Sequence, residues 1–497
     1  DIKAVWEISR FSHFVTLARA YLVSKNEKYY NAFSEQLAAW LKENPYSFGA
    51  NFKCGQECAL RMMNAILAYN VFHAKGLTNN DDEQNLLELI RRCYKKILSN
   101  FFYAHKCIKN NHTISELVGM IIGAWCSCDE KKLKKAYKLL DTVIDDQFSE
   151  DGGYTQYSFN YQRLVLQVLE YVLFISDKTG ISLSEHSLKK LRNSVLLLYQ
   201  CQDQTGDVPN YGFNDGALVF PVSVSEYRDF RPVLGALYGR LFGKCLYSAG
   251  EYDEEAIWFG ILPNTLPKAN ESRIATAFSD AGLFTLRKKH FWMMCVLNDY
   301  KKRPAHMDQL HVDLWIDGVN ALCDCGTYSY ADPEGEALAL TEAHNTTKIE
   351  NTEQMTKKGA FLVYDRTKRC AHNLSKDVFW GKMHSKQGYT HERHIEMREN
   401  GVDIYDVLTA KTDRKFDLIL HTPCDIQCDE KRIKLFHEKK HIMTIEGTLD
   451  FEIKDGIRSV YYLTKEQIST IRFMGLVEGG KAQSQIKIDL LTKRGEV

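Results

Sequence analysis

The chain has 497 residues, too many for a single hydrophobic core, and this length predicts two large domains. Lys plus Arg and Asp plus Glu number 64 each, so no net charge favours nucleic acid or a membrane surface, and an anionic ligand needs a local basic patch. No apolar run approaches the roughly 18 residues of a membrane-spanning helix, so we predict no membrane span.

The 14 cysteines are scattered along the chain. The closest spacings, at Cys126 and Cys128 and at Cys323 and Cys325, match neither a zinc ribbon nor a dense disulfide scaffold. We therefore expect buried or inert thiols, with a disulfide or metal role as the alternative. The chain starts at Asp1, without Met and inside an apparent helix, so we expect that an upstream segment has been removed.

Residues 1–262 show a helical period. In residues 112–128 the apolar side chains recur at i, i+3 and i+4, at Ile114, Leu117, Val118, Ile121, Ile122 and Trp125. Similar stripes occupy residues 5–23, 56–72, 161–175 and 187–200. This pattern predicts stacked helical hairpins in a ring or a solenoid, joined by turn-rich loops of the kind that carry binding sites.

After about residue 262 the period changes to two. Leu310, Val312, Leu314 and Ile316 alternate with His311, Asp313 and Trp315. The pair Asp317-Gly318 is typical of a hairpin turn, and residues 319–324 form the returning strand. Short alternating runs continue to the end of the chain and predict an antiparallel sandwich.

Seven motifs occur in a fixed order: WEISR at 6–10, NNHTISELVG at 110–119, DGGYTQYSFNYQR at 151–163, PNYGFNDGA at 209–217, RPAHMDQLHVDLW at 303–315, CDCGTYSY at 323–330 and AHNT at 343–346. Together they resemble the heparinase II/III type of polysaccharide lyase. The resemblance implies an α+β multidomain chain. Residues 1–262 would form an N-terminal α/α toroid, an incomplete barrel of helical hairpins, and residues 263–497 a C-terminal antiparallel β-sandwich.

The resemblance also implies β-elimination at a uronic acid. Such a reaction needs a group that neutralises the carboxylate, a base that removes the C5 proton and an acid that protonates the leaving oxygen. Asn111 matches the neutraliser, because an amide donates without titrating; the alternative is that Asn110 or Asn111 only caps a helix. Tyr161 matches the acid, and the role of the base is also open to it; Tyr157, one helical turn earlier, is the residue most easily confused with it.

His306 and His112 match the partners of Tyr161. We expect His306 to act as base or charge partner and His112 to contact the carboxylate or sugar, with the opposite assignment left open. Arg303 would bind a substrate carboxylate or sulfate, or is an ordinary surface residue.

The family pattern places a divalent ion behind the catalytic histidine, with Asp308, Asp324 and His344 as ligands. Two carboxylates and one imidazole suit manganese or zinc, with calcium as a third candidate, and we expect the ion to be structural. A two-residue turn at Asp317-Gly318 pairs Ile316 with Val319 and places Asp324 opposite His311. Asp308 and Asp324 would then lie on opposite faces, so either a bulge near Gly326 corrects the register or His311 replaces Asp308.

Other candidates for substrate binding lie on predicted toroid loops and on one later strand, and each has a purely structural alternative. They are Asn51, Glu57, Arg61, Asn210, Asn214, His391 and Arg393.

We predict a lyase that acts on an acidic polysaccharide, with a glycosaminoglycan such as heparan sulfate, heparin, hyaluronan or chondroitin sulfate as the leading substrate. Alginate or a bacterial exopolysaccharide is the alternative, as is a carbohydrate-binding relative without catalysis. A hydrolase ranks lower, because the motifs supply no carboxylate pair. Polymer substrates favour a secreted or periplasmic bacterial enzyme, whereas the many thiols favour a reducing compartment such as the cytoplasm; the oligomeric state stays open.

Overall fold

The computed structural model describes residues 2–491, which form two compact units. The helical unit contains the chain up to Phe148, together with Gln162–Arg192 and Ala217–Asn270. The sandwich unit contains Ser149–Tyr161, Asn193–Gly216 and the chain from Glu271. Two turn-rich segments of the helical half therefore pack with the strands. A domain boundary between residues 262 and 263 stays a prediction.

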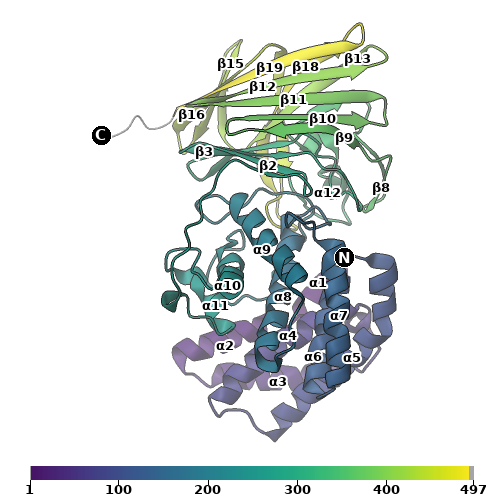
Figure 1. The fold of residues 1–497 in the computed structure, drawn as a ribbon, viewed down its shortest axis with the longest axis vertical. Coiled ribbons are helices and arrows are strands. Elements are labelled where there is room, and N and C mark those ends of the chain that lie inside the picture. The colour runs from purple at the N-terminus through teal and green to yellow at the C-terminus, as the bar shows by residue number, and fades with distance from the viewer. Residues whose placement is uncertain (1, 492–497) are drawn as a thin grey trace, which may run out of the picture. The chain divides into compact units, whose positions relative to one another are not determined.

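Helices dominate the first half of the chain (Figure 1). The α-helices are α1 (Ile2–Ile8), α2 (Ser12–Ser24), α3 (Lys28–Glu43), α4 (Gly55–Ala74), α5 (Asn80–Tyr103), α6 (Asn111–Cys126), α7 (Glu130–Gln147), α8 (Phe159–Thr179), α9 (Glu185–Gln200), α10 (Arg231–Phe242) and α11 (Glu254–Trp258). Short 3-10 turns are η1 (Ala50–Phe52), η3 (Glu251–Asp253) and η4 (Pro263–Thr265), and η2 (Ala104–Ile108) is a π-helical segment.

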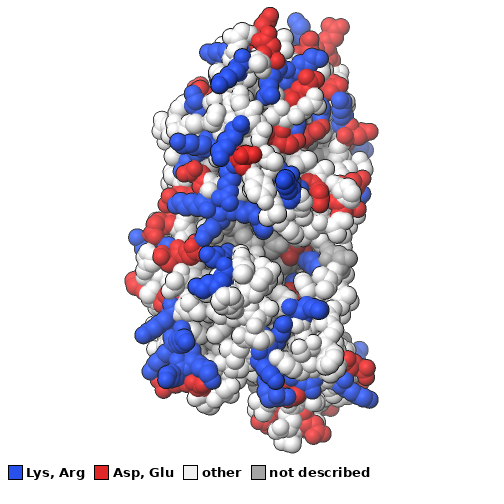
Figure 2. Space-filling view, turned by 90° about the vertical axis from the view of Figure 1, so that its right-hand side faces the viewer, with Lys and Arg blue, Asp and Glu red and all other residues white. Residues whose placement is uncertain are grey.

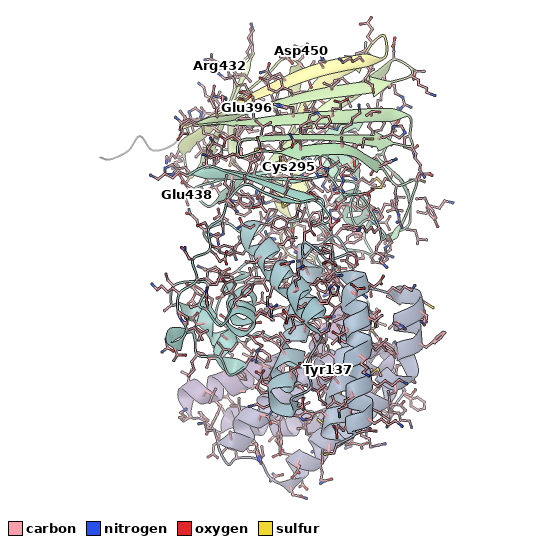
Figure 3. The ribbon with its side chains drawn as sticks, viewed as in Figure 1. Tyr137, Cys295, Glu396, Arg432, Glu438 and Asp450 are labelled. Atoms are coloured by element: carbon pink, nitrogen blue, oxygen red, sulfur yellow. The ribbon has the colours of Figure 1, made fainter. Side chains whose placement is uncertain are left out.

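Helix α6 is packed on most of its surface. Five residues of its predicted stripe, from Ile114 to Ile122, are fully buried, as the i, i+3, i+4 pattern predicts. A Cβ at Gly119 would lie 2.9 Å from that of Ala59 on α4, so the glycine permits close packing of these helices. Tyr137 on α7, labelled in Figure 3, is buried and its hydroxyl donates to the Val172 carbonyl at 3.1 Å.

The strands form four sheets. A five-stranded sheet has the order β1 (Thr276–Phe278), β2 (Leu283–Arg287), β3 (Phe291–Val296), β4 (Val312–Ile316), β5 (Val319–Leu322). An eight-stranded sheet has the order β14 (Asp425–Cys428), β15 (Arg432–His437), β16 (Lys440–Gly447), β19 (Lys481–Leu490), β12 (Gly401–Ala410), β11 (Tyr389–Arg398), β10 (Val378–Ser385), β9 (Lys368–Leu374). A four-stranded sheet has the order β17 (Asp450–Arg458), β18 (Glu466–Val477), β13 (Arg414–Thr422), β6 (Thr347–Ile349), and β7 (Thr356–Lys358) pairs with β8 (Leu362–Tyr364). The short helices α12 (Pro333–Ala337) and η5 (Thr341–Ala343) precede β6.

The named strand pairs are antiparallel, as predicted, and one apolar core joins the five-, eight- and four-stranded sheets. Strand β4 differs from the simple alternating pattern, because all five of its residues are buried. On the face of β4 that points away from the apolar core, Trp315 stacks on Trp292, with 5.8 Å between ring centroids. Trp292 in turn donates to Asp203 of the Asn193–Gly216 segment. That segment covers the face that would otherwise meet solvent.

The turn at Asp317-Gly318 has positive φ at both residues, as a two-residue hairpin turn requires. Ile316 pairs with Val319, which confirms the predicted turn register. Beyond it, Trp315 pairs with Asn320 but Leu314 pairs with Leu322, so Ala321 is an extra residue. The uncorrected register that placed Asp324 opposite His311 is therefore wrong, and the bulge lies at Ala321 rather than near Gly326.

The surface has no dominant sign of charge on the face that Figure 2 shows, where Lys and Arg are interspersed with Asp and Glu and gather only locally. Among the helices of residues 2–491, none has the length and apolarity to cross a bilayer. All 14 cysteines are free thiols; eight are buried, and one of these, Cys295, lies in the sandwich core on β3 (Figure 3).

Candidate active site

Asn111 is the first residue of α6, and Asn110 is the residue that caps this helix. The Asn110 side chain accepts a hydrogen bond from the His112 amide at 3.0 Å. The buried Asn111 amide instead donates to Oε1 of Gln56 at 2.8 Å, and Ser115 donates to the same oxygen at 3.2 Å. Gln56 on α4 therefore fixes the orientation of the Asn111 amide, and the helix does not need Asn111 as its cap.

His112 is half-buried beside Asn111 and has a thiol neighbour. Its Nδ1 lies 3.4 Å from Sγ of Cys54, the residue before α4. The side chain keeps partial access to solvent, as a substrate contact requires.

Tyr161 lies in the first turn of α8, where its backbone amide donates to Oγ of Ser158 at 3.1 Å. Its hydroxyl lies 2.9 Å from that of Tyr330, a residue of the sandwich unit. Burial, and secondly the Tyr161 hydroxyl, raises the pKa of Tyr330. Tyr330 therefore remains protonated and can donate to the Tyr161 oxygen, which would stabilise a Tyr161 phenolate.

Tyr157 has a different role from Tyr161. It is buried, its ring lies edge-on to Tyr300, and its hydroxyl accepts from the backbone amides of Lys301 and Lys302 at 2.9 and 3.3 Å. These contacts fix the chain just before Arg303. The Tyr157 hydroxyl thus holds the backbone in place, whereas the Tyr161 hydroxyl contacts another side chain.

His306 is 2% exposed and sits among aromatic rings. The Phe213 ring lies edge-on to the imidazole, with 5.1 Å between ring centroids, and Nε2 of His306 lies 3.4 Å from Oγ1 of Thr327. Burial, and secondly the charge of His344, lowers the pKa of His306 to about 3. The imidazole is therefore neutral near pH 7, the form that can accept a proton.

Asn210 and Asn214 connect the Asn193–Gly216 segment to the strands. The Asn210 amide donates to the Ser459 carbonyl at 2.8 Å, and Thr327 accepts from the Asn214 backbone amide at 3.2 Å. Because Thr327 also contacts His306, this segment helps to position the histidine. Both asparagines are about 5% exposed, so substrate contact by their side chains stays a prediction that their burial does not favour.

A candidate metal centre lies behind His306. Nδ1 of His344 and Oδ2 of Asp324 are 2.8 Å apart, and the ligand atoms of His306, Asp324 and His344 all lie within 4.8 Å of one another. Nε2 of His344 and Nδ1 of His306 are buried without a hydrogen-bond partner among residues 2–491. Buried polar atoms of this kind are usually satisfied, so the two nitrogens fit an ion.

Asp308 and His311 lie close to this centre but outside that group of three. Oδ1 of Asp308 accepts from the Tyr300 hydroxyl at 3.1 Å. Nε2 of His311 lies 2.8 Å from Asp313 and 3.8 Å from Asp324. The second carboxylate oxygen of Asp308 could still bind an ion, and the role of Asp308 as a ligand stays a prediction.

Glu57 and Arg61 are fixed inside the helical unit. Glu57 forms a bidentate pair with Arg10, and Arg61 donates to the Ser9 carbonyl and lies over the Trp40 ring. Both are at most 1% exposed, which does not favour the predicted substrate contact. Asn51 is half-buried and donates to Asn44 at 2.8 Å.

His391 and Arg393 are also fully buried. Both contact Oδ1 of Asp406 at 2.7 Å, and Arg393 donates to the carbonyls of Leu310 and Asn345. This network holds β11, β12 and the segments around Leu310 and Asn345 together. Direct substrate contact by either residue stays a prediction that the burial does not favour.

Arg303 is exposed, and its guanidinium lies 5.3 Å from the centre of the Phe361 ring. It lines an open pocket of about 520 Å³ with Arg366, Lys386 and Asp365. Three cations and one carboxylate give this pocket an excess of positive charge. Phe361 also packs on Phe213 and Tyr330, so the pocket adjoins the residues around His306.

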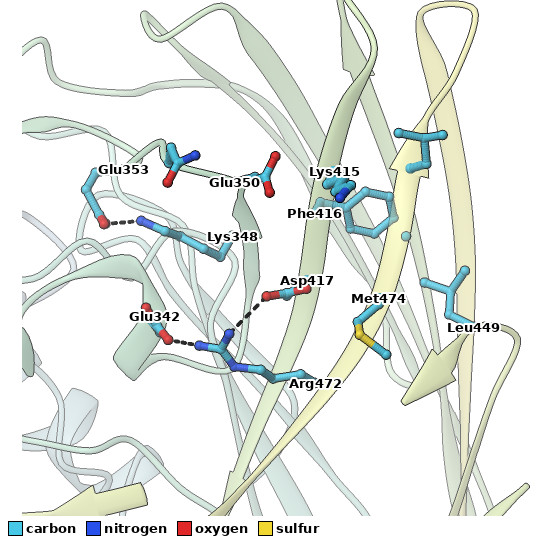
Figure 4. Close-up of a pocket in the computed structure, with 13 residues that line it drawn as sticks. Glu342, Lys348, Glu350, Glu353, Lys415, Phe416, Asp417, Leu449, Arg472 and Met474 are labelled. Atoms are coloured by element: carbon cyan, nitrogen blue, oxygen red, sulfur yellow. Dashed lines mark hydrogen bonds and ion pairs between the residues drawn. The ribbon is translucent and has the colours of Figure 1, made fainter. Parts of the chain in front are cut away.

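A larger pocket of about 1030 Å³ lies on the four-stranded sheet (Figure 4). Ion pairs within its lining join Lys348 to Glu353, and Arg472 to Glu342 and Asp417. None of the predicted site residues lines it, and we assign it no role.

Two sequence-family models match the chain: heparinase II/III N-terminus over residues 1–233 and heparinase II/III-like, C-terminal, over residues 270–487. The chain belongs to the heparinase II/III family. A curated relative, heparin-sulfate lyase from Bacteroides stercoris, is 23% identical over 391 residues, covering 72% of this chain and 54% of the relative. The chain thus spans about half the length of that curated relative.

Solved structures of heparinase II/III-type and chondroitin lyases share the fold. A heparinase III matches with a TM-score of 0.71 at 16% identity, covering 99% of this chain and 80% of its own. Chondroitin AC lyase from Streptomyces coelicolor A3 matches with a TM-score of 0.64 at 9% identity, covering 98% and 74%. These matches confirm the predicted toroid and sandwich architecture.

Three residues around the site were not singled out from the sequence. Tyr330, Thr327 and Phe213 lie within the quoted motifs CDCGTYSY and PNYGFNDGA. Their contacts with Tyr161 and His306 join segments far apart in sequence, which no local pattern reveals.

Proposed function

We propose that this chain cleaves a uronic-acid-containing glycosaminoglycan by β-elimination. The observation that carries the proposal is the contact of the Tyr161 and Tyr330 hydroxyls, 2.9 Å apart in a chain of the heparinase II/III family. A tyrosine with a protonated donor beside it is suited to proton transfer. A protein that only binds carbohydrate has no need of such a pair.

Each step of the elimination has a proposed residue. Asn111 donates to the uronate carboxylate and so lowers the cost of the negative charge that develops when C5 loses its proton. Tyr161 and neutral His306 share the acid and base roles, and His112 contacts the carboxylate or the sugar.

Asp324, His344 and Asp308 are the proposed ligands of a divalent ion, manganese or zinc, with calcium as a third candidate. The ion would neutralise buried carboxylate charge and hold the segments around His306 in place. Its role is structural, and the proton transfers do not pass through it.

Heparan sulfate is the leading substrate, because the curated relative is named a heparin-sulfate lyase and the Arg303 pocket carries excess positive charge. Alginate and bacterial exopolysaccharides are the alternatives. A polymeric substrate favours an exported enzyme, so we propose a secreted or periplasmic location.

The experiment is product analysis by mass spectrometry after incubation with heparan sulfate, hyaluronan, chondroitin sulfate and alginate in turn. Each elimination leaves one fragment that begins with an unsaturated uronate and is one water lighter than the corresponding hydrolysis product. Light fragments from a glycosaminoglycan support the proposal and identify the polymer. Heavier fragments would indicate a hydrolase, and intact polymers throughout would leave a carbohydrate-binding protein as the better description.

A further inference from the structure

Cys54, His112 and Glu116 bring a thiol, an imidazole and a carboxylate together at the start of two neighbouring helices. Cys54 directly precedes α4, and His112 and Glu116 are one turn apart on the same face of α6. One ligand atom from each lies within 4.8 Å of the others. All three belong to the helical unit, so this group is distinct from the centre at Asp324 and His344.

The distance between the Cys54 and His112 ligand atoms matches a tetrahedral zinc site. Zinc bonds of about 2.3 Å to sulfur and about 2.0 Å to nitrogen place the two ligand atoms roughly 3.5 Å apart at a tetrahedral angle. Sγ of Cys54 and Nδ1 of His112 are 3.4 Å apart. Ligands at i and i+4 on one helix face, as His112 and Glu116 are, are a common zinc-binding arrangement.

Glu116 provides an independent observation. It is fully buried; Oε1 accepts from the Asn100 amide at 2.7 Å, and Oε2 has no hydrogen-bond partner of good geometry among residues 2–491. No Lys or Arg forms an ion pair with this carboxylate in that part of the chain. Its atoms lie 2.4–2.7 Å from where a Cβ at Gly55 would stand, so the glycine leaves room for it. A buried carboxylate without a counter-charge is costly, and a cation would remove that cost.

We propose that Cys54, His112 and Glu116 form a binding site for a thiophilic divalent cation such as Zn²⁺, with the fourth coordination position open to solvent beside His112. The thiolate and imidazole select zinc, cadmium or cobalt over magnesium and calcium. The donors of the Asp324 centre are harder, so the two sites differ in metal preference.

The site has a consequence that rests on the proposed function. Nδ1 of His112 would be bound to the cation, which restrains the ring next to Asn111. Excess zinc would then inhibit the lyase, and the thiol of Cys54 would be required for that inhibition.

Absorption spectroscopy with Co²⁺ tests the binding directly, because a cobalt–thiolate bond gives a charge-transfer band in the near ultraviolet that His and Asp ligands do not give. The expected result is a band that saturates at one cobalt ion per chain and disappears when Zn²⁺ is added. Asp324→Asn should retain the band, as should the control Cys107→Ser, whose thiol is exposed. Cys54→Ser and Cys54→Ala should lack the band, and Glu116→Gln should weaken Zn²⁺ affinity by about tenfold or more. Circular dichroism of each variant confirms folding.

A band that is absent in the wild type, or that persists in both Cys54 variants, would overturn the site. The binding measurement needs no substrate, so it remains decisive even if the protein proves inactive on every polymer. In an active protein, zinc inhibition of the wild type but not of Cys54→Ser is the second expected result.

Discussion

The hydroxyl oxygens of Tyr161 and Tyr330 lie 2.9 Å apart, although 169 residues separate them in the sequence. Burial, first of all, raises the pKa of Tyr330. We propose that Tyr330 donates to the Tyr161 oxygen and so stabilises negative charge there, which would let a tyrosine act near neutral pH without a metal on its oxygen.

Removal of the donor should slow the chemical step. We expect Tyr330→Phe to lower kcat by about tenfold to a hundredfold with little change in KM, because a hydrogen bond to a charged group contributes about 1.5–3 kcal/mol. The Phe ring retains the packing on Phe213 and Phe361. Tyr328→Phe is the matched control; equal kcat for both variants and the wild type would remove Tyr330 from the mechanism.

The two tyrosines of the Tyr157–Tyr161 turn should separate activity from stability. Tyr157→Phe leaves the amides of Lys301 and Lys302 without their acceptor and should lower the free energy of unfolding by about 1–3 kcal/mol, while the folded fraction retains its kcat. Tyr161→Phe should lower kcat by about a hundredfold or more with a smaller change in stability. Urea unfolding and initial rates measure both; the reverse pattern would exchange their roles.

The sequence alone predicts the elements well where the pattern is local. The stripe of α6 and the turn at Asp317-Gly318 depend on near neighbours, and both are confirmed. The bulge at Ala321 was not located, because a register shift leaves the alternation of the strand almost unchanged. The sequence does not predict that Arg61 is buried against Trp40. Arg61 lies just after a turn-rich segment, near the start of a predicted helix, where an arginine is usually exposed.

The basic pocket should act on substrate affinity rather than on chemistry. Arg303→Gln should raise KM for a sulfated polymer several-fold, leave kcat nearly unchanged, and reduce the salt dependence of kcat/KM, because exposed charges are screened by salt. Arg432→Gln on β15, labelled in Figure 3, is an exposed control. A loss of kcat with constant KM would place Arg303 in the chemical step instead.

The predicted ion should contribute to stability. Manganese or zinc at about a hundred times its Kd should add roughly 2.7 kcal/mol to the free energy of unfolding. The Tm should fall on chelation and recover with metal, and Asp324→Asn should abolish the response. Cys54→Ser, in the other proposed metal site, should leave the manganese response intact. A Tm that chelators and metals leave unchanged would contradict the centre.

A buried carboxyl pair, Glu170 and Glu255, should make the protein less stable at alkaline pH. Burial raises the pKa of Glu255 to about 7 and, with the charge of Glu255, raises that of Glu170. The folded state then holds protons that the unfolded state releases above about 4.5, so stability is full below that pH and is lost as the pH rises through about 7.

The double variant Glu170→Gln and Glu255→Gln should remove most of this dependence, because burial raises the pKa of both carboxyls. Chemical unfolding at pH 5 and pH 8 should show a wild-type loss of about 1–3 kcal/mol that the double variant lacks. Glu255→Gln alone should reduce the loss while it retains the hydrogen bond from Gln167. Glu226→Gln is an exposed control from the same unit. Parallel stability curves for the wild type and Glu255→Gln would contradict the assignment.

The most direct test of the account follows the ultraviolet absorbance of the conjugated C4–C5 double bond while heparan sulfate is incubated with the wild type, Tyr161→Phe and Tyr157→Phe. We predict a steady rise with the wild type, a similar rise per folded molecule with Tyr157→Phe, and almost none with Tyr161→Phe. New reducing ends without this absorbance, or equal rates for the wild type and Tyr161→Phe, would contradict elimination by Tyr161.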